Sequence, residues 1–193
     1  MRRIGITGGI GSGKSVVSRL LRIMGYSVYD TDSEAKRLME SSLEVVQKLS
    51  ECFGRDIYHN GRLNRGLLSS RVFGESDKIV LLNSIVHPVV RFDFYRWSES
   101  LNEEICFVES AILYESRFDE LVDEVWTVTA PEELRIGRVR QRSGLTEEEI
   151  KKRMAAQLSE EEKQRRAAHI IWNDGNVSVI HLSLIHISEP TRH

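Results

Sequence analysis

The chain has 193 residues, of which 40% are hydrophobic and 29% charged, a size suited to one α/β domain with an insertion or two. Its net charge of −2 and pI near 6.3 argue against broad binding to nucleic acid or to a membrane surface. Its two cysteines provide neither a disulfide framework nor a metal-ligand spacing. Because no signal peptide or membrane-spanning apolar run is present, we expect a cytoplasmic protein.

A glycine-rich loop lies between the first predicted strand, Arg2 to Thr7, and the first predicted helix. Residues 8–15 read G-G-I-G-S-G-K-S and fit the P-loop pattern G-x-x-x-x-G-K-S/T. Apolar residues then recur at helical spacing from Val17 to Met24. The N–H groups and the dipole at such a helix start favour an anion. A flexible glycine-rich turn would explain the glycines but not Lys14-Ser15, so we expect phosphate binding.

Two acids follow the second predicted strand, Tyr26 to Tyr29. The carboxyl ends of parallel strands face the ligand crevice, so Asp30 and Asp32 are candidates for a general base or a water-mediated Mg²⁺ contact. Asp32 could instead cap the next helix, but Thr31 and Glu34 already fit a capping box. That favours a functional Asp32, although spacing alone does not choose between the two acids.

Residues 33–102 have helical periodicity and no clear strand, which predicts a helical insertion that holds the second substrate. Interruptions are expected near Ser41-Ser42, at Gly54 and at His87-Pro88. Several arginines lie near the start of this insertion, and the commoner explanation for any one of them is a solvated surface residue. A phosphate clamp nevertheless needs donors from outside the P-loop, and Arg65 is the first candidate.

Two further buried strands are predicted, at Ile105–Glu109 and Val125–Thr129. The acid that ends the first resembles a Walker-B position, which supports Mg²⁺. The helix after the second carries Arg135, Arg138 and Arg142 within an arc of roughly 60°. Such stacked like charges indicate an anion, so we expect lid arginines rather than a solvated basic face.

Residues 147–166 are strongly charged and predict a solvent-exposed helical pair that closes over bound nucleotide. A capping box at Thr146 and Glu149 starts it, and a last strand at His169–Trp172 leads into a turn at Asn173. These elements predict an α/β fold, a P-loop NTPase-like parallel sheet flanked by helices. We divide the chain into a nucleotide-binding core (1–32, 103–140 and 167–181), an insertion (33–102) and a lid (141–166).

The ordered motifs from residue 4 to 176 together resemble the dephospho-coenzyme A kinase family. They are T-G-G-I-G-S-G-K-S at 7–15, D-T-D at 30–32, N-R-x-x-L…V-F at 64–73, L-N-x-I-x-H-P at 82–88, E-S-A-I-L-Y-E at 109–115, R-x-x-x-R at 138–142, R-M-x-x-Q at 153–157 and N-D-G at 173–175. The chain departs from the family at Glu109, where Asp is usual, at Ala111, where Pro is usual, and at His169, where Asp is common.

The resemblance implies ATP- and Mg²⁺-dependent phosphorylation of the ribose 3′-hydroxyl of dephospho-coenzyme A. From the composition, we expect no nucleic-acid or membrane partner. Asp32 would orient or deprotonate that hydroxyl, and Lys14, Arg138 and Arg142 would stabilise the transferred phosphoryl group. Ser15 would bind Mg²⁺. The expected ATP-binding residues are Gly8, Gly9, Ile10, Gly11, Ser12, Gly13, Lys14, Ser15, Val16 and Asn173. The expected substrate-binding residues are Asp32, Arg65, His87 and Glu109.

The chain's last residues differ from the family, which closes with a helix. Residues 182–193 have no helical apolar stripe and contain Pro190, and they look like translated sequencing-adapter read-through. We therefore expect this segment to be non-native.

Two other functions are compatible with the P-loop. A different small-molecule or nucleoside monophosphate kinase would share the loop, the lid arginines and the size, but not the helical insertion and the motif order. A nucleotide-dependent switch with slow turnover is the other alternative. A guanine-specific switch would need an N-K-x-D segment, and the sequence has none.

Overall fold

The computed structural model describes residues 1–175, so the expectation for 182–193 lies outside the described residues. The chain divides into two compact units. Unit 1 comprises Met1–Tyr29 and the chain from Asn102 onward, and unit 2 comprises Asp30–Leu101. Within 1–175, none of the helices combines the length and apolar character needed to cross a membrane.

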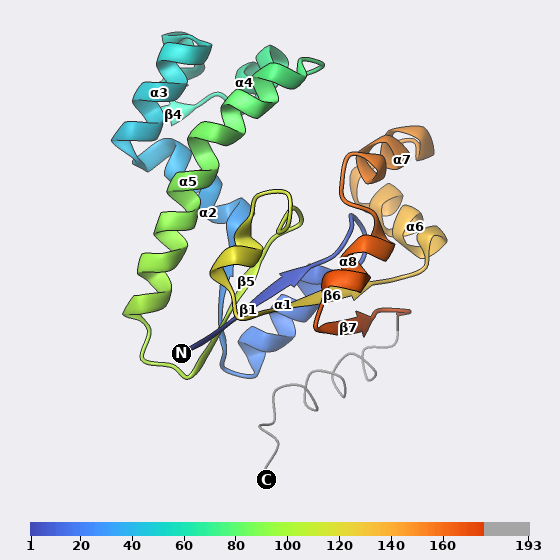
Figure 1. Cartoon of the computed structure of the whole chain (residues 1–193). Coiled ribbons are helices and arrows are strands. Elements are labelled where there is room, and N and C mark those ends of the chain that lie inside the picture. The colour runs from blue at the N-terminus through green and yellow to red at the C-terminus, as the bar shows by residue number, and fades with distance from the viewer. Residues whose placement is uncertain (176–193) are drawn as a thin grey trace. The chain divides into compact units, whose positions relative to one another are not determined.

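Unit 1 is built on a five-stranded sheet with the order β2-β5-β1-β6-β7 (Figure 1). Strand β1 pairs in parallel with β5 on one side and with β6 on the other, and β6 pairs in parallel with β7. All five strands were predicted and are confirmed. Their bounds are Arg2–Thr7 (β1), Ser27–Asp30 (β2), Ile105–Glu109 (β5), Glu124–Thr129 (β6) and His169–Trp172 (β7).

The core of unit 1 forms where helix α1 (Lys14–Ile23) packs against this sheet. Phe107 and Trp126 meet edge to face with ring centroids 5.3 Å apart, an arrangement that aromatic pairs prefer. Apolar residues from four strands and α1 complete the cluster: Ile4, Ile6, Val17, Leu21, Phe107, Trp126, Val128 and Ile171. The loop between β1 and α1 is therefore held at both ends by buried elements.

Three helices follow β6, namely α6 (Glu132–Ser143), α7 (Glu147–Ala155) and α8 (Glu160–Arg166). The predicted capping box of Thr146 and Glu149 starts α7 and is confirmed. The prediction of a solvent-exposed helical pair over 147–166 does not hold at two positions, because Ile150 and Lys163 are completely buried. The ammonium of Lys163 has a carboxylate oxygen of Glu160 as a counter-charge at 3.7 Å, but no hydrogen-bond partner among residues 1–175.

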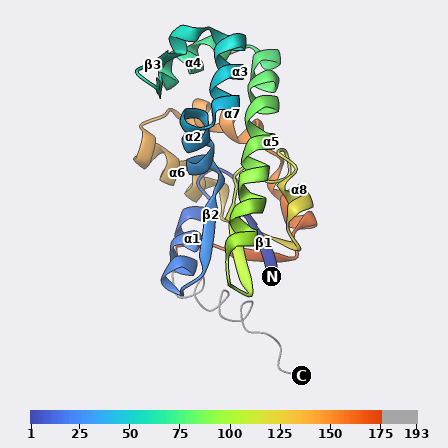
Figure 2. The ribbon, with the colours of Figure 1, turned by 90° about the vertical axis from the view of Figure 1, so that its left-hand side faces the viewer.

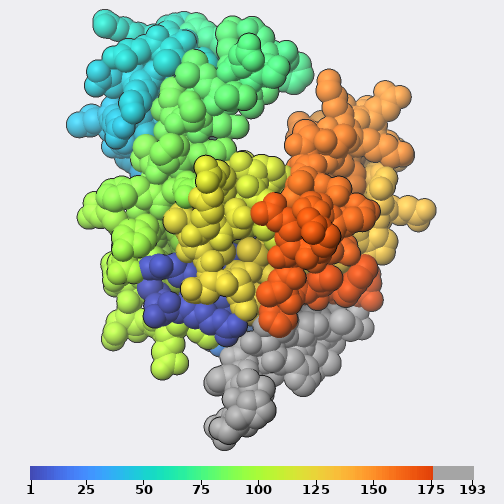
Figure 3. Space-filling model, viewed as in Figure 1, coloured from blue at the N-terminus to red at the C-terminus, as the bar shows by residue number. Residues whose placement is uncertain are grey.

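Helix α8 also contacts the segment that follows β5, which contains the short 3₁₀ helix η2 (Phe118–Leu121). Arg166 makes an ion pair with Asp119 at 2.9 Å and lies over the ring of Tyr114. The space-filling view shows the two segments side by side on one face of unit 1 (Figure 3).

Unit 2 is mainly helical, and α2, α3 and α5 lie side by side in it (Figure 2). A two-stranded antiparallel hairpin, β3 with β4, lies in the region where no clear strand was predicted. The bounds are Thr31–Ser41 (α2), Leu43–Phe53 (α3), Arg55–Ile57 (η1), Tyr58–His59 (β3), Arg62–Leu63 (β4), Arg65–Val72 (α4) and Ser76–Ser100 (α5).

Two local predictions for unit 2 are wrong. Thr31 and Glu34 do not form the cap of α2; Asp30 is the N-cap, and its carboxylate accepts from the amides of Asp32 and Ser33. Asp can occupy this position because its short side chain reaches the first free amides of a helix. Pro88 does not end a helix either, because α5 continues through it. Buried side chains on both sides of Pro88, such as Val86 and Phe94, hold the helix together despite the missing hydrogen bond.

Candidate functional site

The loop between β1 and α1 has the backbone that its glycines permit. Gly8, Gly11 and Gly13 have φ values of 148°, 79° and 97°, which other residues rarely adopt. A Cβ on Gly8 would lie 2.1 Å from the carbonyl oxygen of Val128, and one on Gly13 would lie 1.9 Å from Nδ2 of Asn173. Glycine is thus required twice over at these positions, by conformation and by space.

Lys14 and Ser15 form the first turn of α1, directly after the N-cap Gly13. The ammonium of Lys14 donates to the carbonyl of Gly8 at 2.8 Å, so this side chain bends back over the loop. Ser15 is exposed. The first turn of α1 contains no acidic residue, whereas those of α7 and α8 contain three each. The positive end of the α1 dipole is therefore not neutralised by a side chain of its own, which suits an anionic ligand.

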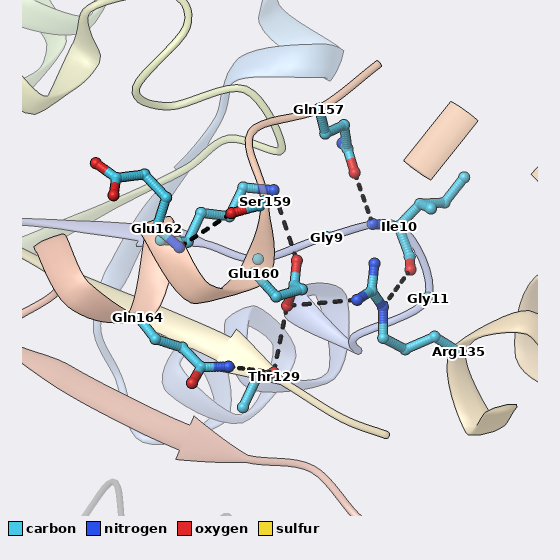
Figure 4. Close-up of polar contacts among 12 residues, drawn as sticks. Gly9, Ile10, Gly11, Thr129, Arg135, Gln157, Ser159, Glu160, Glu162 and Gln164 are labelled. Atoms are coloured by element: carbon cyan, nitrogen blue, oxygen red, sulfur yellow. Dashed lines mark hydrogen bonds and ion pairs between the residues drawn. The ribbon is translucent and has the colours of Figure 1, made fainter. Parts of the chain in front are cut away.

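Four side chains from later in the chain grip the loop from outside, and we call them the outer clasp: Arg135, Arg138, Gln157 and Asn173. Two of them bind Ile10 (Figure 4). Oε1 of Gln157 accepts from the amide of Ile10 at 2.9 Å, and Nε of Arg135 donates to the carbonyl of Ile10 at 3.1 Å.

The other two members of the outer clasp bind the next two carbonyls of the loop. Arg138 donates to Gly11 O at 3.4 Å, and Nδ2 of Asn173 donates to Ser12 O at 2.8 Å. Three successive carbonyls of the loop are therefore occupied on its outer side.

The predicted lid arginines have three different environments. Arg135 is buried and lies 3.6 Å from Glu160, so the prediction that it faces a ligand is wrong. The negative charge beside Arg135 is the carboxylate of Glu160, in α8. Arg138 is half-buried and also donates to the main-chain and side-chain oxygens of Asn173. Arg142, one turn further along α6, is exposed.

The two candidate acids differ in their local bonding within unit 2. One carboxylate oxygen of Asp30 accepts from the amides of Asp32 and Ser33 at 3.0 and 3.1 Å. Asp32 lies exposed in the first turn of α2 and does not cap it. This difference favours Asp32 as the acid with a chemical role.

The remaining candidates have different surroundings in the two units. Arg65 is exposed and makes an ion pair with Glu40 at 3.1 Å. His87 is half-buried in α5; burial, and then the charge of Arg91, lower its pKa, which favours neutral imidazole. Glu109 ends β5 and pairs in register with Ile6 of β1, so it lies at the carboxyl end of the strand next to the one that leads into the loop.

Comparison with known proteins identifies the family. The family model described as dephospho-CoA kinase matches residues 2–178. The chain belongs to the dephospho-CoA kinase family.

Individual members of the dephospho-CoA kinase family resemble the chain over most of its length. A dephospho-CoA kinase of Porphyromonas gingivalis is 44% identical over 90% of this chain and 86% of its own. One from Corynebacterium diphtheriae is 40% identical over 93% of this chain and 92% of its own. Among solved structures, a Thermus thermophilus protein is 36% identical, with a TM-score of 0.83 over 96% of this chain and 95% of its own. A shikimate kinase of Acinetobacter baumannii, with a TM-score of 0.57 over 97% and 91% but 16% identity, shares the fold.

Sequence reasoning missed part of the site of this dephospho-CoA kinase family member. Gln157 was noted in a motif but received no role, and Glu160 and Lys163 received none. A role for Gln157 could have been predicted, because this residue ends the family motif R-M-x-x-Q at 153–157. Glu160 and Lys163 belong to a run of acids and bases that reads as a solvated helix face, so nothing in the pattern distinguished them.

Proposed function

We propose that this chain transfers the terminal phosphoryl group of ATP to the ribose 3′-hydroxyl of dephospho-coenzyme A, giving coenzyme A. The observation that carries the proposal is a strand-to-helix P-loop with Lys14 and Ser15 in the first helical turn, in a chain that matches the family model over residues 2–178. In this chemistry, positioning and charge stabilisation supply most of the catalysis.

On the donor side, we assign the phosphates of ATP to the concave side of the loop. The amides of Gly11, Gly13, Lys14 and Ser15 would donate to them, and the Lys14 ammonium would leave the Gly8 carbonyl to join them. Occupation of the loop carbonyls by the outer clasp supports this assignment, since oxygens that point toward the clasp do not repel phosphate. Gly8, Gly9, Ile10, Ser12 and Val16 would shape the loop rather than donate. Asn173 would border the adenine while it supports Ser12.

Mg²⁺ fits the residues present. Within residues 1–175, no three His, Cys, Asp or Glu side chains gather to form a metal site. A magnesium ion of this kind is held mainly by phosphate oxygens and water, with few protein ligands. The exposed Ser15 hydroxyl would be the protein ligand, and Glu109 would act through water. The ion would neutralise charge on the phosphates.

On the acceptor side, Asp32 would accept the proton of the 3′-hydroxyl and orient its oxygen. Arg138 and Arg142 would stabilise charge on the transferred phosphoryl group. Arg65 and His87, both in the helical unit, would bind the rest of dephospho-coenzyme A. In that role, Arg65 would exchange its ion pair with Glu40 for an anionic group of the substrate.

The test is the mass of the product after the full chain is mixed with Mg²⁺, ATP and dephospho-coenzyme A. We expect a product heavier than the acceptor by one phosphoryl group and identical to coenzyme A on chromatography. AMP, CMP and shikimate serve as alternative acceptors and should not react. Lys14→Ala is the loss-of-function control, because it removes the charge beside the phosphates. Phosphorylation of an alternative acceptor in place of dephospho-coenzyme A would refute the proposal.

A further inference from the structure

We propose that Glu160 is a positioning residue for phosphoryl transfer, which holds Arg135 against the P-loop and so aims the amide of Gly11 at the nucleotide phosphates. The inference rests on the proposed function, because it assigns a task to residues outside the reacting groups. Neither the P-loop pattern nor the lid arginines require an acid at this position.

The carboxylate of Glu160 is the centre of a buried charged cluster in unit 1 (Figure 4). Its Oε2 accepts from Oγ1 of Thr129 at 3.2 Å and lies 3.6 Å from the guanidinium of Arg135. Its Oε1 lies 3.7 Å from Nζ of Lys163. The side chains of Arg135, Glu160 and Lys163 are 6%, 17% and 0% exposed. Charges so little exposed to water interact strongly, and Glu160 is a counter-ion of both cations, at 3.6 and 3.7 Å.

This cluster lies directly against the backbone of the loop. A Cβ built on Gly9 would lie 2.3 Å from Nη2 of Arg135 and 2.3 Å from Oε1 of Glu160. The ion pair therefore occupies the space that a side chain at residue 9 would need. In the same position, Nε of Arg135 donates to the carbonyl of Ile10 at 3.1 Å. Glu160 thus fixes the guanidinium from one side while the loop accepts its hydrogen bond on the other.

Because a peptide bond is planar, this contact also sets the direction of an amide on the inner side of the loop. In a trans peptide, the C=O of one residue and the N–H of the next point in opposite directions. A carbonyl of Ile10 held toward Arg135 therefore turns the amide of Gly11 away from the outer clasp. Gly11 has a φ of 79° and no side chain, so no side chain of its own restrains that peptide. Asn173 acts in the same way on the next peptide but one, through Ser12 O and the amide of Gly13.

Lys163 explains why Glu160 cannot be tested by a single substitution. Burial lowers the pKa of Lys163, and the charges of Glu160 and Glu115 oppose that shift. Removal of one partner from a buried ion pair is strongly destabilising, because the other charge remains uncompensated. Glu160→Gln alone would leave two buried cations without their carboxylate. Replacing Lys163 with Met at the same time removes one of these charges and keeps a long apolar side chain in the space.

The experiment measures kcat and both KM values for the full-length double variant Glu160→Gln/Lys163→Met. We expect kcat to fall at least about tenfold, since a single oriented donor contributes more than that to related transition states. The KM for dephospho-coenzyme A should stay within about twofold of the wild-type value, because the acceptor site is unchanged. The matched control is Glu161→Gln, an exposed acid on the same helix, which should keep the wild-type kcat.

A second variant, Arg135→Lys, keeps the positive charge beside Glu160 but loses the Nε donor to Ile10. It should show the same loss of kcat as the double variant. Melting curves establish which variants are folded. A folded variant of either kind with the wild-type kcat would overturn the inference, and so would a change confined to the KM for dephospho-coenzyme A. A purely structural role would lower the melting temperature alone.

One further readout separates this inference from the proposed function. Affinity for a non-hydrolysable ATP analogue should fall in both variants and stay unchanged in Glu161→Gln, whichever acceptor the enzyme uses. If the wild-type chain fails to phosphorylate dephospho-coenzyme A, the proposed function is wrong, and this affinity still decides the role of Glu160. Equal affinities in all four proteins would refute the positioning role.

Discussion

Two aspartates stand two positions apart at the start of α2, and their surroundings differ. Asp30 accepts two backbone amides and caps the helix, whereas the carboxylate of Asp32 is exposed and does not cap it. The sequence favoured Asp32 through an apparent capping box of Thr31 and Glu34, which does not form, and spacing alone did not separate the two acids.

Replacing Asp32 with Asn tests the proposed base. We expect kcat to fall by about 10²–10⁴, the usual contribution of a positioned general base, with affinity for ATP within about twofold. Steady-state kinetics and calorimetric titration of an ATP analogue measure the two quantities. The matched control is Asp30→Asn, since Asn is as good an N-cap as Asp and should preserve both folding and turnover. A large loss of kcat in Asp30→Asn, with none in Asp32→Asn, would reverse the assignment.

The two cysteines should differ in reactivity. Cys52 is exposed, whereas Cys106 lies in β5 within the core, and burial raises the pKa of its thiol to about 11. Because the thiolate is the reactive form, a maleimide at neutral pH should label native protein once, at Cys52. Mass spectrometry of the peptides identifies the site, and Cys52→Ser should abolish native labelling. Rapid labelling of Cys106 in folded protein would contradict its buried position.

At the scale of elements, α7 depends on its cap. This helix has nine residues and a single buried side chain, Ile150, so neither length nor packing contributes much to its stability. The Thr146 hydroxyl accepts from the amide of Glu149, and the Glu149 carboxylate accepts from the amide of Thr146.

Thr146→Ala should therefore destabilise α7 by about 1 kcal/mol. Hydrogen exchange of α7 amides measures this effect, and their protection should fall while that of β1 and β5 stays constant. Thr146→Ser keeps the hydroxyl and serves as the control. Unchanged protection in Thr146→Ala would mean that other contacts hold the helix.

The elements that could be predicted from sequence are those that neighbouring residues along the chain determine. The strands of unit 1 follow from short apolar runs, and the P-loop follows from its glycines, Lys14 and Ser15. Contacts between distant segments were not predictable. Arg135 was expected to face a bound anion, and Glu160 belongs to a run of charges typical of a solvated helix face. Only the packing of α6 and α8 shows that they neutralise each other against Gly9. Likewise, Pro88 reads as a helix end, and α5 continues through it because of side chains that the local rule does not include.

At the scale of the whole molecule, His87 should link stability to pH. Burial and Arg91 lower its pKa in the folded state below the unfolded value of 6.5, so the unfolded chain binds more protons as the pH falls. This contribution to stability is fully present above pH 6.5 and is lost as the pH falls through the folded-state pKa.

Urea unfolding at several pH values from 7.5 to about 5 measures the effect. The free energy of unfolding should decrease toward acid pH, and His87→Gln, which cannot titrate, should decrease less. The same slope in both proteins would show that His87 does not contribute.

The outer clasp has a consequence for the order in which this protein matures during synthesis. Ile10 and Ser12 leave the ribosome early, but Arg135, Gln157 and Asn173 follow 125, 147 and 161 residues after their loop partners. Domains fold as units once their chain has emerged, so the nascent P-loop lacks its outer supports until translation is nearly finished. Competence to bind nucleotide should therefore arise late and abruptly, and ribosome-bound chains that stop short of Asn173 should not acquire it.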